Sequence, residues 1–146
     1  LPAFAGTVKA TVPADDAEMK KGQGRILVMD DEPLLCGFLA KVLTRLGYTV
    51  ETTADGALAV ARYRETWGTK ESFDAVILDL TVPAGKGGRE AIKELLKINP
   101  RIKAVVSSGY ANDPVMSNFK EHGFSAVLSK PYNTQELSQV VHRLLF

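Results

Sequence analysis

Cysteine, net charge and long apolar runs are all scarce in this sequence of 146 residues. The single cysteine, Cys36, excludes an internal disulfide framework and indicates a reducing compartment. The 18 basic and 17 acidic residues leave a formal net charge of +1, which gives no reason to expect a nucleic acid or an anionic membrane as a partner. No apolar stretch approaches the length that spans a bilayer, and no signal-peptide pattern is visible. We therefore expect a cytoplasmic protein without direct membrane contact.

The hydrophobic content of 45% is enough for one folded domain that needs neither disulfides nor a structural metal. Residues 1–24 show no periodicity and contain several glycines and prolines, which predicts a linker. Over residues 25–146, short β-branched runs alternate with longer stretches of helical periodicity, the pattern of a parallel sheet with crossover helices. We predict strands near 25–29, 48–51, 74–78, 102–106 and 125–128, and helices near 33–46, 55–66, 87–98, 113–122 and 133–145.

Carboxylates follow two of the predicted strands directly. The first strand is followed by Asp30, Asp31 and Glu32, and the third is followed by Asp79. Ligands bind at the carboxyl edge of an open α/β sheet, so Asp30, Asp31 and Asp79 predict a site for a hard cation such as Mg²⁺. The alternative is that Asp30 and Asp31 cap the first helix, an end that we expect Glu32 to serve.

Polar residues also follow the fourth and fifth predicted strands, as Ser107-Ser108 and Lys130-Pro131. The order along the chain is an acid pair, a single aspartate, a hydroxyl and a lysine before proline. This set resembles the receiver domain of two-component response regulators, which takes a phosphoryl group from a histidine kinase onto one aspartate. The resemblance covers residues 25–146. Together with right-handed crossovers, it implies a doubly wound α/β fold of the flavodoxin type, with a five-stranded parallel sheet in the order 2-1-3-4-5.

The resemblance also implies a role for each acidic residue. Asp79 matches the phosphoacceptor, which would attack the phosphorus of a phosphohistidine in line and form an acyl phosphate. Asp31 and Asp79 would bind Mg²⁺ directly, and Asp30 would act partly through water. The backbone carbonyl of Thr81 would be a third direct ligand.

Two further side chains would neutralise the phosphoryl group. The Lys130 ammonium and the Ser108 hydroxyl would each take one phosphoryl oxygen, and the family pattern needs a cis peptide bond between Lys130 and Pro131. Ser107 and Ser108 alternate in direction along a strand, and alignment from Lys130 selects Ser108. Such a domain is not a turnover enzyme by itself, and its expected partner is a histidine kinase or a histidine phosphotransfer domain.

Three short segments resemble the C-terminal receivers of hybrid histidine kinases: Leu1-Pro2-Ala3, 81–83 and 107–110. They predict a regulatory or phosphorelay module, with the linker as the end of a kinase ATP-binding domain. Two alternatives stay open. One is a haloacid-dehalogenase-like phosphatase, because Asp79-Leu80-Thr81 partly matches D-x-D-x-T, although its second Asp would stand where Thr81 is. The other is a pseudo-receiver that only binds proteins. The sequence leaves the oligomeric state open.

Some residues depart from the usual receiver or have two interpretations. Val127 stands where receivers usually carry an aromatic switch residue, so the familiar switch cannot operate in its usual form. Tyr110 either shields the acyl phosphate from water or is a partly buried packing residue. Leu34, Leu35 and Phe38 on the first helix are either partner contacts or core.

Two loops also stand out in the sequence. The segment 66–72 is longer than this loop usually is in the family, and we interpret it as a surface extension at the edge opposite the site. The glycines at 85, 87 and 88 predict a mobile loop after the phosphoacceptor, because their spacing does not match a phosphate-binding loop.

Overall fold

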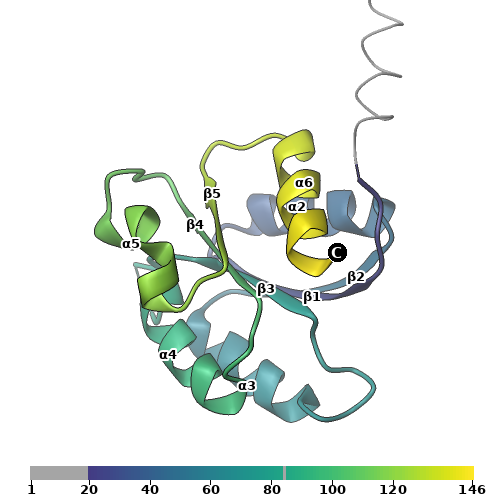
Figure 1. Ribbon diagram of the computed structural model, residues 1–146, viewed down its shortest axis with the longest axis horizontal. Coiled ribbons are helices and arrows are strands. Elements are labelled where there is room, and N and C mark those ends of the chain that lie inside the picture. Colours follow the sequence, from purple (N-terminus) through teal and green to yellow (C-terminus); the bar gives the residue numbers. More distant parts are fainter. Residues whose placement is uncertain (1–19, 84) are drawn as a thin grey trace, which may run out of the picture.

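The computed structural model describes residues 20–83 and 85–146, so most of the predicted linker lies outside the described residues. The centre of the fold is a five-stranded parallel sheet in the order β2-β1-β3-β4-β5 (Figure 1). The α/β class and the strand order predicted from the sequence are confirmed. The strands are β1 (Gly24–Met29), β2 (Tyr48–Thr53), β3 (Ala75–Asp79), β4 (Ala104–Ser108) and β5 (Ala126–Ser129).

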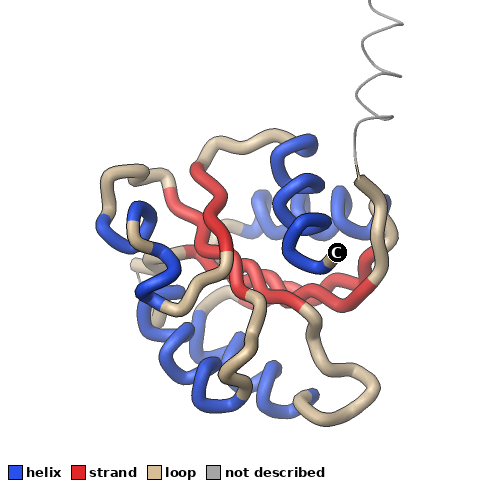
Figure 2. Tube along the Cα trace, viewed as in Figure 1, coloured by secondary structure: helices blue, strands red, loops and turns tan. Residues whose placement is uncertain are grey.

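Helices cover both faces of the sheet, as Figure 2 shows in blue. They are α2 (Pro33–Arg45), α3 (Gly56–Thr66), α4 (Gly88–Ile98), α5 (Pro114–Ser117), the 3₁₀ helix η1 (Phe119–His122) and α6 (Thr134–Leu145). Helices α2 and α6 lie on one face, and α3 and α4 lie on the other (Figure 1). Within the described ranges, no helix is long and apolar enough to cross a membrane.

Alternating strand residues contribute to two hydrophobic cores. Ile26 and Val28 pack in the core that includes α2 and α6, whereas Leu27 and Met29 pack in the core that includes α3 and α4. The central strand β3 is buried along its whole length, because both of its faces are covered. Burial of these apolar side chains holds the two helical layers against the sheet and fixes the carboxyl edge where β1 and β3 end.

The helix that follows β5 begins as its sequence predicts. Oδ1 of Asn133 accepts a hydrogen bond from the Glu136 N–H (2.7 Å), and Oε1 of Glu136 accepts one from the Asn133 N–H (3.1 Å). This reciprocal pair satisfies two N–H groups that a helix start leaves without partners. The cap therefore fixes where α6 begins, at Thr134, four residues after Lys130.

Several predicted boundaries were wrong by one or two residues, and one predicted helix is divided. The third and fourth strands end one and two residues later than predicted, so Asp79 and Ser108 are the last residues of β3 and β4. The apolar run does not mark where pairing stops, because Asp79 still pairs with Ser107 across the two strands. The predicted helix 113–122 is split, since Asn118 leaves the helical region at φ −119° and ψ 43°.

Candidate functional site

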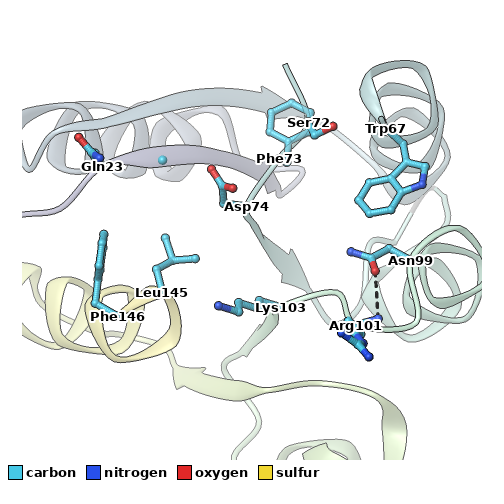
Figure 3. Close-up of a pocket in the computed structure, with 11 residues that line it drawn as sticks. Gln23, Trp67, Ser72, Phe73, Asp74, Asn99, Arg101, Lys103, Leu145 and Phe146 are labelled. Atoms are coloured by element: carbon cyan, nitrogen blue, oxygen red, sulfur yellow. Dashed lines mark hydrogen bonds between the residues drawn. The ribbon is translucent and has the colours of Figure 1, made fainter. Parts of the chain in front are cut away.

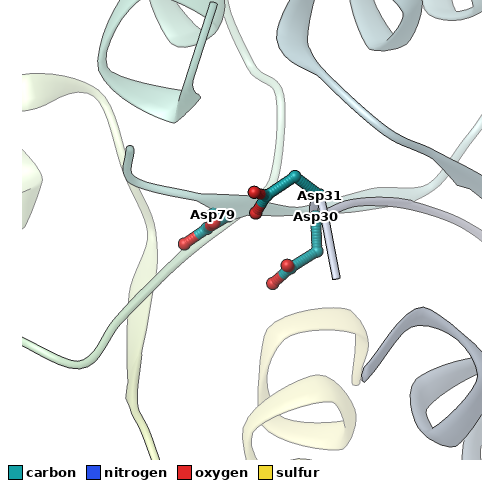
Figure 4. Close-up of side chains that lie close together, drawn as sticks. All are labelled: Asp30, Asp31 and Asp79. Atoms are coloured by element: carbon teal, nitrogen blue, oxygen red, sulfur yellow. The ribbon is translucent and has the colours of Figure 1, made fainter. Parts of the chain in front are cut away.

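Three aspartates meet at the carboxyl edge of the sheet. Met29 and Leu78 are register partners in β1 and β3, so Asp30 and Asp31 emerge beside Asp79. One carboxylate oxygen from each aspartate lies within 4.8 Å of the other two (Figure 4). The structure thus brings together the three carboxylates that the sequence suggested as ligands of a hard cation.

Burial makes this acidic cluster electrostatically costly. Asp30 is 4% exposed and Asp79 is 7% exposed, while Asp31 lies at the surface. Burial, with a smaller contribution from the Asp30 carboxylate, raises the pKa of Asp79 to about 6, although Lys130 opposes the rise. The cluster therefore favours a cation that would neutralise the carboxylates.

Lys130 supplies one such charge from the end of β5. Its Nζ donates to Oδ2 of Asp30 (3.1 Å) and to Oδ1 of Asp79 (3.3 Å). Burial favours the neutral amine, but the hydrogen bonds and charges of Asp30 and Asp79 outweigh it and raise the pKa of Lys130 above its ordinary value. The peptide bond between Lys130 and Pro131 is cis, as the resemblance implied. The ammonium is therefore a charged group held directly over the acidic cluster.

Glu32 occupies the N-cap position of α2, as expected, but its side chain makes no capping hydrogen bond to the helix. Its Oε1 lies 3.7 Å from the Lys130 Nζ, and its N–H donates to Oδ1 of Asp30 (2.9 Å). The Glu32 backbone thus orients the Asp30 carboxylate, while Pro33 begins the helix without needing an N–H partner.

The two serines at the end of β4 have different surroundings. The Ser108 hydroxyl oxygen accepts a hydrogen bond from the Tyr110 N–H (3.0 Å). Among the described residues, the buried hydroxyls of Ser107 and Tyr132 find no hydrogen-bond partner of good geometry. Burial raises the pKa of Tyr132 to about 12, even though the neighbouring Lys130 charge and Ser107 hydroxyl lower it. Ser108 is thus anchored to the loop after β4, whereas Ser107 faces Tyr132.

Two glycines position the segment that carries Thr81, and sequence reasoning missed this role. A Cβ at Gly87 would lie 2.5 Å from the Leu80 carbonyl oxygen, and a Cβ at Gly88 would lie 2.8 Å from the Asp79 carbonyl oxygen. Both glycines are buried and pack directly on the backbone around the site, whereas Gly85 is exposed. The mobility that we expected of this loop stays a prediction. The spacing of these glycines showed glycine content, but it could not show which backbone they would contact.

The structure also shows which residues around the site are exposed and which pack into the core. Tyr110 is 74% exposed, so the alternative of a partly buried packing tyrosine was wrong. Val127 packs against the core beneath α3 and α4. On α2, Leu35 packs into the core, while Leu34 is 91% exposed and Phe38 is also exposed. The first helix therefore contributes both core and an outward apolar face beside the acidic cluster.

Comparisons with known proteins place this arrangement among receiver domains. Residues 26–142 match the response regulator receiver domain family. The transcriptional regulatory protein TcrA of Mycobacterium tuberculosis is 33% identical over 137 residues, which cover 85% of this chain and 51% of TcrA. The sensor kinase CckA of Brucella abortus is 29% identical over 141 residues, which cover 93% of this chain and 14% of CckA. The chain thus spans about half of TcrA and a small part of CckA.

A solved structure agrees with the sequence match. The receiver domain of the sensor histidine kinase PA1611 from Pseudomonas aeruginosa, crystallised with a magnesium ion in its active site cleft, has a TM-score of 0.72 and 25% identity to this chain. The aligned part covers 85% of this chain and 98% of that one. With the family match over most of the sequence and the sheet order of the fold, this chain belongs to the response regulator receiver domain family.

Proposed function

We propose that this domain accepts a phosphoryl group from a phosphohistidine onto Asp79, with Mg²⁺ bound at the acidic cluster. The observation that carries the proposal is the position of the Lys130 ammonium, 3.1 Å from Asp30 and 3.3 Å from Asp79, beside three carboxylates within 4.8 Å. This is the set of charges that positions a phosphoryl group and neutralises its oxygens. Four residues from the ends of three strands, β1, β3 and β5, supply it.

The residues present fit Mg²⁺. The cluster offers oxygen donors only. Burial, with a smaller contribution from the Asp30 carboxylate, keeps the pKa of Asp79 raised despite Lys130, so a bound cation would favour the ionised carboxylate. Asp31 and Asp79 would bind the ion directly, Asp30 would act partly through water, and the Thr81 carbonyl would complete the protein ligands. When bound, Mg²⁺ supplies neutralisation of the carboxylates and of a phosphoryl oxygen. The PA1611 receiver, which holds magnesium in its cleft, supports this assignment.

Asp79 would act as the nucleophile. One of its carboxylate oxygens bonds to phosphorus while the bond from phosphorus to the donor imidazole nitrogen breaks, and the imidazole leaves with that electron pair. The Lys130 ammonium would then donate to a phosphoryl oxygen in place of its present hydrogen bonds to the carboxylates. The Ser108 hydroxyl already accepts a hydrogen bond from the Tyr110 N–H, so its own proton remains free to be donated to a phosphoryl oxygen.

The parent protein is proposed to be a hybrid histidine kinase, in which this domain is a regulatory or phosphorelay module. The match to the kinase CckA over 93% of the chain supports this context, and so do the hybrid-like segments at 81–83 and 107–110. The partner is then a histidine kinase or a histidine phosphotransfer domain, and the location is cytoplasmic. The family match argues against the phosphatase alternative, in which Thr81 would have to be an aspartate.

The metal site can be tested apart from phosphorylation by adding beryllofluoride, a mimic of the phosphoryl group, with and without Mg²⁺. We expect Mg²⁺-dependent amide chemical-shift changes around residues 30–31, 79–81, 108–110 and 130 in the wild type, and a loss of at least about tenfold in Mg²⁺ affinity in Asp31→Asn. Glu65→Gln, which removes a carboxylate on the outer face of α3, is the matched control and should bind Mg²⁺ like the wild type. Equal affinities for Asp31→Asn and the wild type would contradict the assigned ligands.

A further inference from the structure

The segment 66–72, interpreted from the sequence as a surface extension, is held in place by its own side chains. The Thr66 carbonyl oxygen accepts hydrogen bonds from the Thr69 hydroxyl (2.7 Å) and the Ser72 hydroxyl (2.9 Å). The Ser72 hydroxyl oxygen in turn accepts a hydrogen bond from the Gly68 N–H (2.9 Å). This loop fixes the position of Trp67, whose backbone N–H donates to the Tyr63 carbonyl near the end of α3 (3.0 Å).

Trp67 is presented at the surface as a supported ring. Its indole stacks on the Tyr63 ring, with centroids 5.8 Å apart and an interplanar angle of 16°, and Tyr63 stacks in turn on the buried Phe73. Trp67 nevertheless remains 45% exposed. A large aromatic side chain that is already ordered loses little conformational entropy when a ligand covers it.

Trp67 lines a groove of about 600 Å³ at the sheet edge opposite Asp79 (Figure 3). Arg101 and Lys103 also line the groove, and both are exposed and form no ion pair with any residue in the described parts of the chain. The one carboxylate side chain among the lining residues is Asp74, whose Oδ2 accepts a hydrogen bond from the Arg25 backbone N–H (2.8 Å), so the two cations outnumber it. Asn99 connects the aromatic part of the groove to its basic part. Its Nδ2 donates to the Tyr63 hydroxyl, and its Oδ1 accepts from the Arg101 backbone N–H, both at 3.0 Å.

These features together favour one class of ligand. A purely apolar molecule would leave the two cations unused, and a simple anion would leave the indole uncovered. A planar ring can stack on tryptophan whatever its edge groups, and an attached anion gains from two cations that have no internal partner. A groove of this size also lies within the range of small-ligand sites.

We propose that this groove binds a planar aromatic anion of the nucleoside-phosphate class, with its ring on Trp67 and its phosphate near Arg101 and Lys103. The site is separate from the phosphoacceptor cluster, since the two lie at opposite ends of the strands. Its occupation is independent of whether Asp79 is phosphorylated.

Trp67 is the only tryptophan of the chain, so its fluorescence reports on the groove directly. The probe is adenosine monophosphate, titrated with excitation at the red edge of the indole absorption, where adenine does not absorb. We expect saturable quenching that weakens as salt is added. Adenosine, which has only the ring, and ribose 5-phosphate, which has only the anion, should each bind at least about tenfold more weakly.

Four variants make the test specific. Arg101→Gln and Lys103→Gln should each weaken adenosine monophosphate binding by about threefold or more, whereas Lys41→Gln, which removes an exposed cation on α2, should not change it. Asp79→Asn should bind the probe like the wild type. The proposal is overturned by an absence of saturable quenching, by equal binding of the three probes, by an equal effect of Lys41→Gln and Arg101→Gln, or by loss of binding in Asp79→Asn.

Discussion

The Lys130 ammonium lies 3.3 Å from Oδ1 of Asp79 and 3.1 Å from Oδ2 of Asp30, so one cation serves two buried carboxylates. Only the folded sheet brings these residues together, because Lys130 is 51 positions from Asp79 and 100 positions from Asp30 in the sequence. Because the single Lys130 charge is shared among the carboxylates of the cluster, the site has excess negative charge in the absence of a metal ion. That excess makes the site responsive to protonation, to Mg²⁺ and to a phosphoryl group.

The first prediction concerns pH and stability. The pKa of Asp79 is raised from 3.8 to about 6, so the folded state holds this proton more tightly than the unfolded chain does. The free energy of unfolding of the metal-free domain should therefore fall as pH rises from about 4 to about 6. Asp79→Asn removes the effect and should be more stable than the wild type by about 1–2 kcal/mol at pH 7, because solvent at the mouth of the site screens part of the full shift.

Chemical denaturation at several pH values measures this difference. Well below pH 3.8 the variant and the wild type should be equally stable, since Asp79 is protonated in both the folded and the unfolded state there. Saturating Mg²⁺ should stabilise the wild type more than Asp79→Asn. Glu71→Gln, at an exposed carboxylate far from the site, is the control and should follow the wild type at every pH. A stability gap that does not depend on pH would contradict the assigned pKa.

The second prediction separates the adjacent serines. Ser108→Ala removes the proposed donor to the phosphoryl group and should slow phosphorylation by acetyl phosphate by about tenfold. Ser107→Ala removes a buried hydroxyl that makes no hydrogen bond of good geometry, so phosphorylation and stability should both stay close to the wild type. Phosphorylation rates from intact-mass time courses decide between them. A slower rate in Ser107→Ala alone would reverse the assignment.

The third prediction concerns the lifetime of the acyl phosphate. Tyr110 is exposed and follows Ser108 by two residues, where its side chain can restrict the approach of the attacking water. Tyr110→Ala should therefore lose its phosphoryl group several-fold faster, measured after the phosphodonor is removed, while Tyr110→Phe should keep the slow rate. The same rate for Tyr110→Ala and the wild type would show that the ring does not shield the site.

The fourth prediction concerns the partner. Leu34 and Phe38 are exposed apolar residues four positions apart on α2, the helix that begins two residues after Asp31, where a phosphodonor protein would have to approach. Leu34→Ala should slow phosphotransfer from a histidine phosphotransfer domain by about tenfold and leave the reaction with acetyl phosphate unchanged. Leu58→Ala, at an exposed leucine on α3, is the matched control. Equal transfer rates for both variants would exclude this face as the docking surface.

Much of the fold was readable from the sequence because its periodicities were unambiguous. The alternation of apolar runs and helical stretches predicted all five strands, and the crossover rule with the family resemblance gave their order. The sequence was less informative where backbone geometry decides the outcome. The break at Asn118 inside the predicted helix 113–122 has no proline or glycine to mark it, so composition alone could not locate it.

Some parts of the site were likewise predictable from the sequence and others were not. The carboxylates at positions 30, 31 and 79 were predictable because each lies at or just after the end of a strand, and these strands end at the same edge of the sheet. The contacts of Glu32, Gly87 and Gly88 were not, because each depends on which element packs beside it in three dimensions. The ordered segment around Trp67 was missed for a related reason. Its hydrogen bonds connect Thr66 to Ser72 through side chains that would be equally ordinary in a solvent-exposed loop.

The central claim is that Asp79 is a Mg²⁺-dependent phosphoacceptor. The most direct test incubates the full chain with acetyl phosphate, with and without Mg²⁺, and compares the wild type with Asp79→Asn by intact mass. We expect a single added phosphoryl group on the wild type in the presence of Mg²⁺, and none on Asp79→Asn or after chelation. An unmodified wild type under conditions where Mg²⁺ binds, or equal modification of Asp79→Asn, would contradict it.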